Sequence, residues 1–279
     1  MVSVGLALAA AVIYGLSDFL GGVVSKRASV WAVAIASQLG ALVVIGIATW
    51  FFAAEPTPAD LAWGALAGIG TGTGTAFLYR GLSEGRMGVV APISAVGAAL
   101  VPVAVGVLTG DRPPLLTWIG IACAIPAIWL VSSGDAADAE GSRRRSGLVD
   151  GILAGLAFGL MFAALGQVPD TAGLVPLVVA EAVSVVAVAA LASVMGHAFV
   201  PREAAAWWGL GVGALSAFAA VLFLFSTQAG MLTVAAVLSS LYPVFTILLA
   251  ATILRERIHG LQAIGLGLAG VAVVLVAIA

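Results

Sequence analysis

Two carboxyl groups stand inside long apolar stretches of the sequence, where a charged side chain is expensive. Asp18 lies in the first stretch, and Glu181 lies near the middle of the seventh. A charge at the bilayer centre costs roughly 2.5–3.5 kcal/mol on the insertion scale, so such residues face a protein interior and often carry protons or ions. Glu181 is therefore either a proton-coupling or cation-binding carboxylate, or a neutral glutamate that holds helices together by hydrogen bonds. For Asp18 the alternatives are coupling and an interfacial or capping carboxylate.

Uncharged polar side chains recur at helical spacing in two further stretches. These stripes are Thr71, Thr75 and Tyr79 in the third stretch and Ser239, Tyr242 and Thr246 in the ninth. Residues three or four apart share one face of a helix, so each stripe predicts the lining of a cavity. The alternative is that the hydroxyl groups bond to carbonyls of their own helix. Pro243 interrupts the second stripe and frees a backbone carbonyl for a substrate or a neighbouring helix.

Five more residues complete the candidate substrate site: Tyr14, Ser17, Gln38, Ser94 and Phe158. Gln38 must find a partner inside the membrane, and cavity lining and helix–helix hydrogen bonding are both open for it. The aromatic rings of Tyr14 and Phe158 suit an apolar substrate or plain packing. His197 and His259 lie in connections without a second histidine or cysteine at metal-ligand spacing, so no metal and no cofactor are expected.

The elements that position these residues are membrane-spanning helices. The chain has 279 residues, of which 62% are hydrophobic and 9% charged, whereas a soluble domain carries about 25% charged residues. Apolar runs long enough to cross a ~30 Å hydrocarbon core recur from end to end. The expected fold is an all-α integral membrane protein. Its predicted spans are 3–24, 30–52, 61–82, 88–108, 115–132, 148–166, 172–195, 205–228, 232–253 and 261–278.

The sequence repeats itself at an offset of 145 residues. The matched pairs include Trp63-Gly64 with Trp208-Gly209, Gly68 with Gly213, Ser94 with Ser239, and Ile119-Gly120 with Ile264-Gly265. The expected organisation is a five-span repeat at 1–132, a linker at 133–147 and a second five-span repeat at 148–279. An odd number of spans places the two repeats upside down relative to each other, an architecture of many secondary transporters.

The basic residues support this span count. Of the 11 Lys and Arg residues, all except Arg112 fall on connections that would share one side of the membrane. Lys and Arg mark the cytoplasmic side, so the tally predicts that both termini lie outside. The run from Arg143 to Arg145 is interpreted as a topology signal or a lipid headgroup contact, and nucleic acid is not an expected partner.

The segment from Val237 to Gly270 resembles the end of the EamA domain of the drug/metabolite transporter superfamily. It has a Ser-rich turn, Pro-Val-Phe-Thr, an apolar run, Glu-Arg and a Gly-rich final span. Tyr14-Gly15-Leu16-Ser17 is similar to the aromatic-Gly-small motif of the family, with Phe158-Gly159 as its counterpart in the second repeat. The resemblance implies ten helices, alternating access, and a central cavity lined by both repeats.

This chain departs from the family pattern at three points. Gln38 and Val183 occupy positions where the family often has arginine. Asp111-Arg112 in the first repeat corresponds only partly to Glu256-Arg257 in the second. The family usually places both termini in the cytoplasm, whereas the tally of basic residues gives the reverse. The mainly uncharged candidate lining, which carries aromatic rings and hydroxyl groups, favours a neutral or zwitterionic substrate over a sugar phosphate.

The expected function is secondary transport of a small organic metabolite, such as an amino acid, an amine or a lipophilic compound. We expect a multi-pass exporter in the inner or plasma membrane, with the lipid bilayer as its surroundings and protons as the candidate coupling ion. A lipid-carrier flippase is the alternative. An intramembrane enzyme is disfavoured because no histidine in a predicted span could activate Ser17 or Ser94, and no HExxH motif is present.

Overall fold

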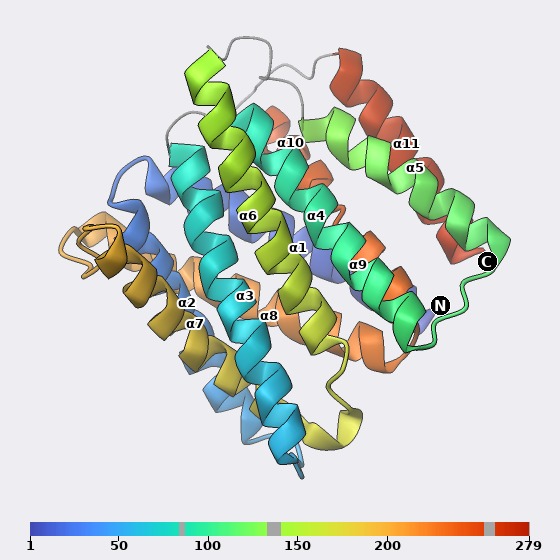
Figure 1. Ribbon diagram of the computed structural model, residues 1–279, viewed down its shortest axis with the longest axis horizontal. Helices are drawn as coiled ribbons and strands as arrows, with labels where there is room; N and C mark the ends of the chain where they lie inside the picture. The colour runs from blue at the N-terminus through green and yellow to red at the C-terminus, as the bar shows by residue number, and fades with distance from the viewer. Residues whose placement is uncertain (84–86, 133–140, 254–259, 279) are drawn as a thin grey trace.

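The computed structural model describes residues 1–83, 87–132, 141–253 and 260–278, and the elements in these ranges are helices (Figure 1). The first repeat comprises α1 Val2–Ser25, α2 Val30–Thr49, α3 Pro58–Ser83, α4 Met87–Thr109 and α5 Leu115–Ser132. The second comprises α6 Gly141–Leu165, α7 Val175–Val194, α8 Gly209–Gln228, α9 Leu232–Ser239, α10 Tyr242–Ile253 and α11 Gly260–Ala277. Short 3-10 helices, η2 Asp170–Ala172 and η3 Ala204–Trp208, precede α7 and α8.

The predicted all-helical membrane class is confirmed and helices occupy the predicted spans, with two differences. The predicted ninth span, 232–253, is broken between α9 and α10, because Pro243 has no N–H for the helix ladder and fits only the first turn of a new helix. Residues 141–147 of the predicted linker belong to α6, since a helix can continue into the aqueous interface. Residues 133–140 and the Glu256-Arg257 pair lie outside the described part of the chain.

The apolar helices differ in how well each suits a bilayer. Five helical stretches in the described part of the chain are long and apolar enough to cross a membrane, and four others contain shorter apolar runs. The third helix belongs to neither group. It is rich in glycine and threonine, and it packs against α6, α7, α2, α4 and α1. Part of α3 is nevertheless exposed, including Trp63 and Ile69, and the Thr73 hydroxyl there donates to the Ile69 carbonyl of its own helix at 2.6 Å.

The helices of the two repeats pack in a two-fold pattern. α1 packs on α8 and on the α9–α10 pair, just as α6 packs on α3 and α4. α2 packs on α8 as α7 packs on α3, and α5 lies beside its own counterpart α11 (Figure 1). This pattern is the one expected of two five-helix repeats that interlock in opposite orientations.

Glycines allow the backbones of the two repeats to approach each other closely. A Cβ atom at Gly15 of α1 would lie 2.7 Å from the Tyr242 carbonyl oxygen of α10, and one at Gly159 of α6 would lie 2.6 Å from Val101 Cβ of α4. Gly15 and Gly159 are the glycines of the two aromatic-Gly motifs. The motif therefore marks the point where the first helix of each repeat crosses the fourth helix of the other.

The glycines that recur at the 145-residue offset have the same function on a second pair of interfaces. Gly64 and Gly68 of α3 lie against the backbone of α7, and Gly209 and Gly213 of α8 lie against the backbone of α2. Small residues four apart permit such backbone contact between membrane helices.

One end of the bundle collects most of the described basic residues. The Ser29 N–H after α1 donates to Glu203 after α7 at 2.9 Å, and Trp31 stacks on His197 with ring centroids 5.4 Å apart. The end of α3 joins the same group of contacts through Arg80. We call this the basic end, because Lys26, Arg27 and Arg202 follow α1 and α7 there. Arg112 follows α4 at the opposite end, where the neighbouring Asp111 accepts hydrogen bonds from Thr233.

The replacement Gly15→Ala should destabilise the protein because its methyl group would push α1 away from α10. Overpacking typically costs about 1–3 kcal/mol, so we expect a thermal unfolding midpoint several degrees lower in detergent micelles. The matched control is Gly22→Ala on the same helix, where no atom lies within 4 Å of the added Cβ. Equal midpoints for the two variants would show that α1 and α10 are not in backbone contact.

Candidate functional site

A narrow cavity lies between the two repeats and is lined by six helices. Its lining consists of Tyr14, Ser17 and Asp18 from α1, Ser37 and Gln38 from α2, Thr71, Thr75, Leu78 and Tyr79 from α3, Phe158, Met161 and Phe162 from α6, Ser216 from α8, and Tyr242 from α10. The cavity volume is about 50 Å³. This volume holds a few water molecules and is smaller than the ~300–1,000 Å³ of most ligand pockets, so a solute can enter only when the helices separate.

The cavity follows the internal symmetry of the chain. Positions related by the repeat occur together in its lining. Tyr14 pairs with Phe158, Ser17 with Met161 and Asp18 with Phe162 at the offset of 144 that aligns the two aromatic-Gly motifs, and Thr71 pairs with Ser216 at the offset of 145. Helices α1 and α6, and likewise α3 and α8, therefore contribute equivalent faces. The site lies where the two inverted repeats meet.

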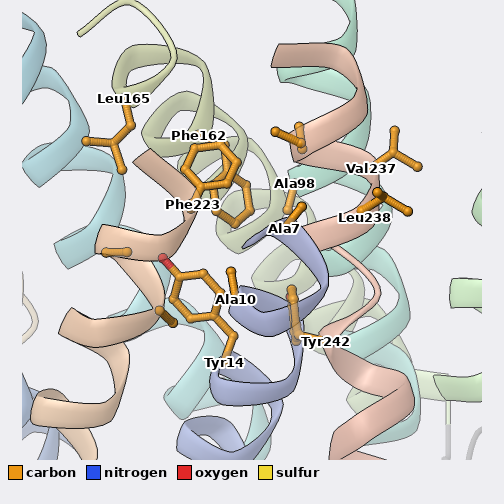
Figure 2. Packing of buried hydrophobic residues seen from close by; sticks show 14 of the residues in the cluster. Ala7, Ala10, Tyr14, Ala98, Phe162, Leu165, Phe223, Val237, Leu238 and Tyr242 are labelled. Carbon is orange, nitrogen blue, oxygen red and sulfur yellow. The ribbon is translucent and has the colours of Figure 1, made fainter. Parts of the chain in front are cut away.

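The two repeats give this cavity walls of different chemistry. The wall from α1 carries the hydroxyl groups of Tyr14 and Ser17 and the carboxyl group of Asp18, whereas the equivalent wall from α6 is apolar. Tyr14 meets Phe162 edge to face, with ring centroids 6.0 Å apart and an interplanar angle of 72°. Phe162 in turn packs on Phe223 of α8, as Figure 2 shows. The aromatic packing fixes the apolar wall in position.

Asp18 is the centre of the polar wall. The chain contains three tyrosines, and all of them line the cavity. Each one, Tyr14, Tyr79 and Tyr242, interacts electrostatically with the Asp18 carboxylate. Asp18 accepts no hydrogen bond from any residue that the structure describes, and no described lysine or arginine lines the cavity. The carboxylate thus faces the cavity as its single acidic group within the described lining.

Two tyrosine hydroxyl groups in the same lining also lack a hydrogen bond to a described residue. The Tyr14 hydroxyl is buried and has no hydrogen-bond partner within the described ranges of the chain. The Tyr242 hydroxyl lies beside the Ser94 side chain but makes no hydrogen bond of normal geometry to a described group. Buried polar groups are normally hydrogen-bonded, so these hydroxyl groups have capacity for a further partner.

Most of the predicted substrate-site residues meet around this one cavity. Those in its lining are Tyr14, Ser17, Gln38, Thr71, Thr75, Tyr79, Phe158 and Tyr242, and Asp18 joins them from the predicted coupling pair. Their proximity is a structural finding, whereas their role in binding stays a prediction. Cavity lining and hydrogen bonding within the helix, the two alternatives for the threonine stripe, both apply to Thr71. It lines the cavity, and its hydroxyl donates to the carbonyl of Ala67 at 2.9 Å.

Four predicted residues, Ser94, Ser239, Thr246 and Glu181, are not in the lining of the cavity. Ser94 and Ser239 are fully buried, and the Ser239 hydroxyl donates to the Ala7 carbonyl at 3.3 Å. They occupy equivalent positions on α4 and α9, so the repeat places both in contacts between helices. Thr246, which completed the second stripe, also donates across a helix interface, to the Gly15 carbonyl at 3.1 Å.

Glu181 is the fourth predicted residue outside the lining. It is buried on α7, which packs against α2 and α3, and the Ser184 hydroxyl donates to its carboxyl group at 3.3 Å. It nevertheless interacts electrostatically with Tyr14. Glu181 therefore lies behind the cavity wall, and both its coupling role and its purely structural role remain compatible with this position.

Five lining residues were missed by sequence reasoning: Ser37, Leu78, Met161, Phe162 and Ser216. The repeat offset carried a signal for three of them. Met161, Phe162 and Ser216 are the counterparts of Ser17, Asp18 and Thr71, which were already candidates. Transferring each candidate to the other repeat would have found them.

Comparison with known proteins agrees with the architecture. The sequence matches the profile described as the EamA-like transporter family over residues 1–133 and 145–278. A solved structure titled "Crystal structure of protein" has a TM-score of 0.66 and 15% sequence identity, over 96% of this chain and 98% of that chain. At this identity the likeness concerns the fold alone. No curated protein is a significant sequence match.

The hydrogen bond from the Gln38 amide to the Thr75 hydroxyl, 3.3 Å long, joins α2 to α3 in the cavity wall. A double-mutant cycle with Gln38→Leu and Thr75→Val should give a coupling of about 0.6 kcal/mol, the average for hydrogen bonds between membrane helices. The free energy of unfolding in detergent measures it. Strictly additive effects would show that the two side chains do not interact in the folded protein.

Proposed function

The chain belongs to the EamA-like transporter family, and from this premise we propose that it is a secondary transporter that moves a small organic metabolite by alternating access. The proposal extends to export as the direction and to the inner or plasma membrane as the location. Amino acids, amines and lipophilic compounds are the candidate substrates. The observation that carries the proposal is the cavity between the inverted repeats, because the substrate sites of such transporters lie at the repeat interface.

Equivalent contacts close the bundle at its two ends, which supports alternating access. At the basic end Arg80 of α3 forms an ion pair with Asp150 of α6, whose side chain is 1% exposed. At the opposite end the symmetry-related helices α8 and α1 are joined by Ser226 and Ser3. Each of these serine hydroxyls donates to the carbonyl of the other residue, at 2.8 and 2.9 Å. Both contacts cross between repeats, so separation of the repeats at either end would break one of them.

The two closures differ in chemistry although they join symmetry-related pairs of helices. The basic end is held by a charged pair, and Arg80 also lies over the Phe77 ring, 4.8 Å from its centroid. The opposite end is held by neutral hydroxyl groups. Each end can therefore be weakened independently by substitution. We propose that Arg80 and Asp150 hold the basic end closed in this conformation.

The replacement Asp150→Asn should open the cavity toward the basic end. We expect a cysteine at Ser216, in a Cys123→Ser background, to react several-fold faster with a polar maleimide when Asp150→Asn is added. Ser216 lines the cavity, so its reactivity reports access. Asp170→Asn at an exposed site of the opposite end is the matched control. An unchanged rate in a variant that unfolds at the same temperature would contradict a closing role for the pair.

The coupling proposal concerns Asp18 in the cavity and Glu181 behind its wall. Acidic residues inside transporters commonly relay protons, and the electrostatic interaction of both carboxyl groups with Tyr14 places them around one side chain. Glu181 has no acidic counterpart in the first repeat, where the same offset gives Ala36. We propose that Glu181 exchanges protons during transport.

Proteoliposomes test both the transport activity and the coupling proposal. A screen over amino acids, amines and lipophilic drugs should identify a transported solute, and its rate should depend on the pH gradient. Glu181→Gln should abolish that dependence because the amide cannot exchange a proton. Glu55→Gln, at an exposed position after α2, is the control. Gradient-dependent transport that persists in Glu181→Gln would leave Glu181 a structural residue.

The two alternative functions receive less support from the site. A lipid-carrier flippase needs a cavity that is open to the bilayer, whereas the cavity here lies between six helices of the two repeats. A serine hydrolase would need a histidine that activates one of the cavity hydroxyl groups, and no histidine is found in the described lining. If the reconstituted protein flipped a fluorescent lipid and transported no solute, the flippase would be favoured over the solute transporter.

A further inference from the structure

The chemistry of the two cavity walls is complementary to a ligand that is cationic at one end and apolar at the other. The polar wall brings one carboxylate, Asp18, among three tyrosines, and the opposite wall from α6 presents Phe158, Met161 and Phe162. Because the cavity lies between these walls, a single small molecule would contact both. This arrangement bears on the kind of solute that the site accepts.

The charge of the described lining points to a cation. Asp18 is its acidic group, and no basic side chain in the described lining neutralises it. A buried carboxylate without a partner is costly, so buried charges are normally paired. An anionic solute would add a second negative charge to the same small space. A cation would pair with Asp18 and would also meet the electron-rich faces of aromatic rings, which attract cations within about 6 Å.

The unsatisfied hydroxyl groups indicate which chemical class of cation fits the cavity. A primary ammonium group has three N–H donors and no acceptor. The Asp18 carboxylate can accept from one of them, and the Tyr14 and Tyr242 hydroxyl oxygens are free to accept from others, because neither makes a regular hydrogen bond with a described residue. A quaternary ammonium group offers no such donors. The acceptors at the polar wall therefore match a protonated primary amine.

We propose that this cavity binds a small primary ammonium compound, with the ammonium group at Asp18 of the tyrosine-lined polar wall and the hydrocarbon portion against Phe158, Met161 and Phe162 of α6. The assignment rests on the proposed transport function for its biological meaning, but the binding itself does not require transport. It changes the expectation from the sequence, in which a mainly uncharged lining favoured a neutral or zwitterionic substrate. The change follows from the position of Asp18, which faces the cavity.

The test compares ligands of one shape and different charge on the full-length protein in detergent micelles. Isobutylammonium, isobutanol and isobutyrate form one set, and benzylammonium, benzyl alcohol and benzoate form a second. Binding is measured by thermal stabilisation as a function of ligand concentration. The ammonium member of each set should bind at least about 10-fold more tightly than the neutral member, because hydrogen bonds to charged groups are the strong ones. The carboxylates should not bind.

Substitutions then locate the binding site. Asp18→Asn should abolish the preference for ammonium over alcohol, whereas Asp18→Glu should retain part of it because the charge remains. Tyr14→Phe should weaken ammonium binding a few-fold by removing one acceptor. Asp170→Asn, which removes an exposed carboxylate remote from the cavity, should leave all affinities unchanged. Size-exclusion profiles and unfolding midpoints of the ligand-free variants identify any that fail to fold.

The contribution of the apolar wall is measured separately, through the dependence of affinity on the size of the hydrocarbon portion. Within the ammonium series, affinity should rise from methylammonium to isobutylammonium by about four-fold for each methylene group that becomes buried against α6. Phe162→Ala should reduce this gain without removing the preference for a positive charge. A flat series would contradict contact between the hydrocarbon portion and α6.

The outcomes separate this inference from the proposed function. If neither ammonium compound binds better than its neutral match to the wild-type protein, the inference is overturned, whatever any variant does. If proteoliposomes nevertheless transport another class of solute, the transport proposal is supported although the ammonium-binding inference fails. If ammonium compounds bind in an Asp18-dependent manner but no solute crosses the membrane, the ligand assignment stands and the transport proposal fails.

Discussion

Close backbone contact between the two inverted repeats is the constraint on which the rest of the structure depends. Membrane helices gain little by burying apolar side chains, since lipid tails are equally apolar, and they associate through van der Waals packing at small residues and through hydrogen bonds. Here the contacts occur at symmetry-related glycines, with Gly15 on α10 and Gly159 on α4, and with Gly68 on α7 and Gly213 on α2. These crossings fix the first and third helix of each repeat against the other repeat. The cavity is the space that this interlocking leaves between them.

The symmetry of the backbone is not matched by symmetry of the chemistry. Equivalent positions of α1 and α6 hold Asp18 in one repeat and Phe162 in the other, and the two ends of the bundle are joined by an ion pair and by a serine pair. An inverted repeat needs equivalent helix crossings so that either end can close around one central site. It does not need equivalent side chains, so substitutions that differ between the repeats can give the cavity a polar and an apolar wall.

Polar groups in this protein are divided between holding helices and lining the cavity. Arg80, Asp150, Ser3 and Ser226 join helices of different repeats and have partners. The Asp18 carboxylate and the Tyr14 hydroxyl have no hydrogen-bond partner in the described part of the chain and belong to the same polar wall. In a low-dielectric interior, satisfied polar groups make a structure rigid, whereas unsatisfied ones are costly. The cost left at the cavity is what a ligand of complementary charge would relieve.

The amino-acid sequence by itself determined the membrane class, the spans, the inverted repeat and the side on which the basic residues gather. These properties depend on hydropathy and on spacing along the chain, which one sequence displays directly. It also identified most of the cavity residues, because polar side chains in apolar helices must face an interior. Ser94 and Ser239 belonged to the same pattern but lie within helix interfaces, and Glu181 lies behind the wall.

Only the tertiary structure decided which polar residues face the cavity and which face a neighbouring helix. That choice depends on the rotation of each helix about its axis, which is set by the glycine crossings with the other repeat. The break of the ninth span before Pro243 and the inclusion of Ser37, Met161, Phe162 and Ser216 in the lining have the same origin. Contacts between residues more than a hundred positions apart fix these orientations, and the periodicity of a single helix contains no information about them.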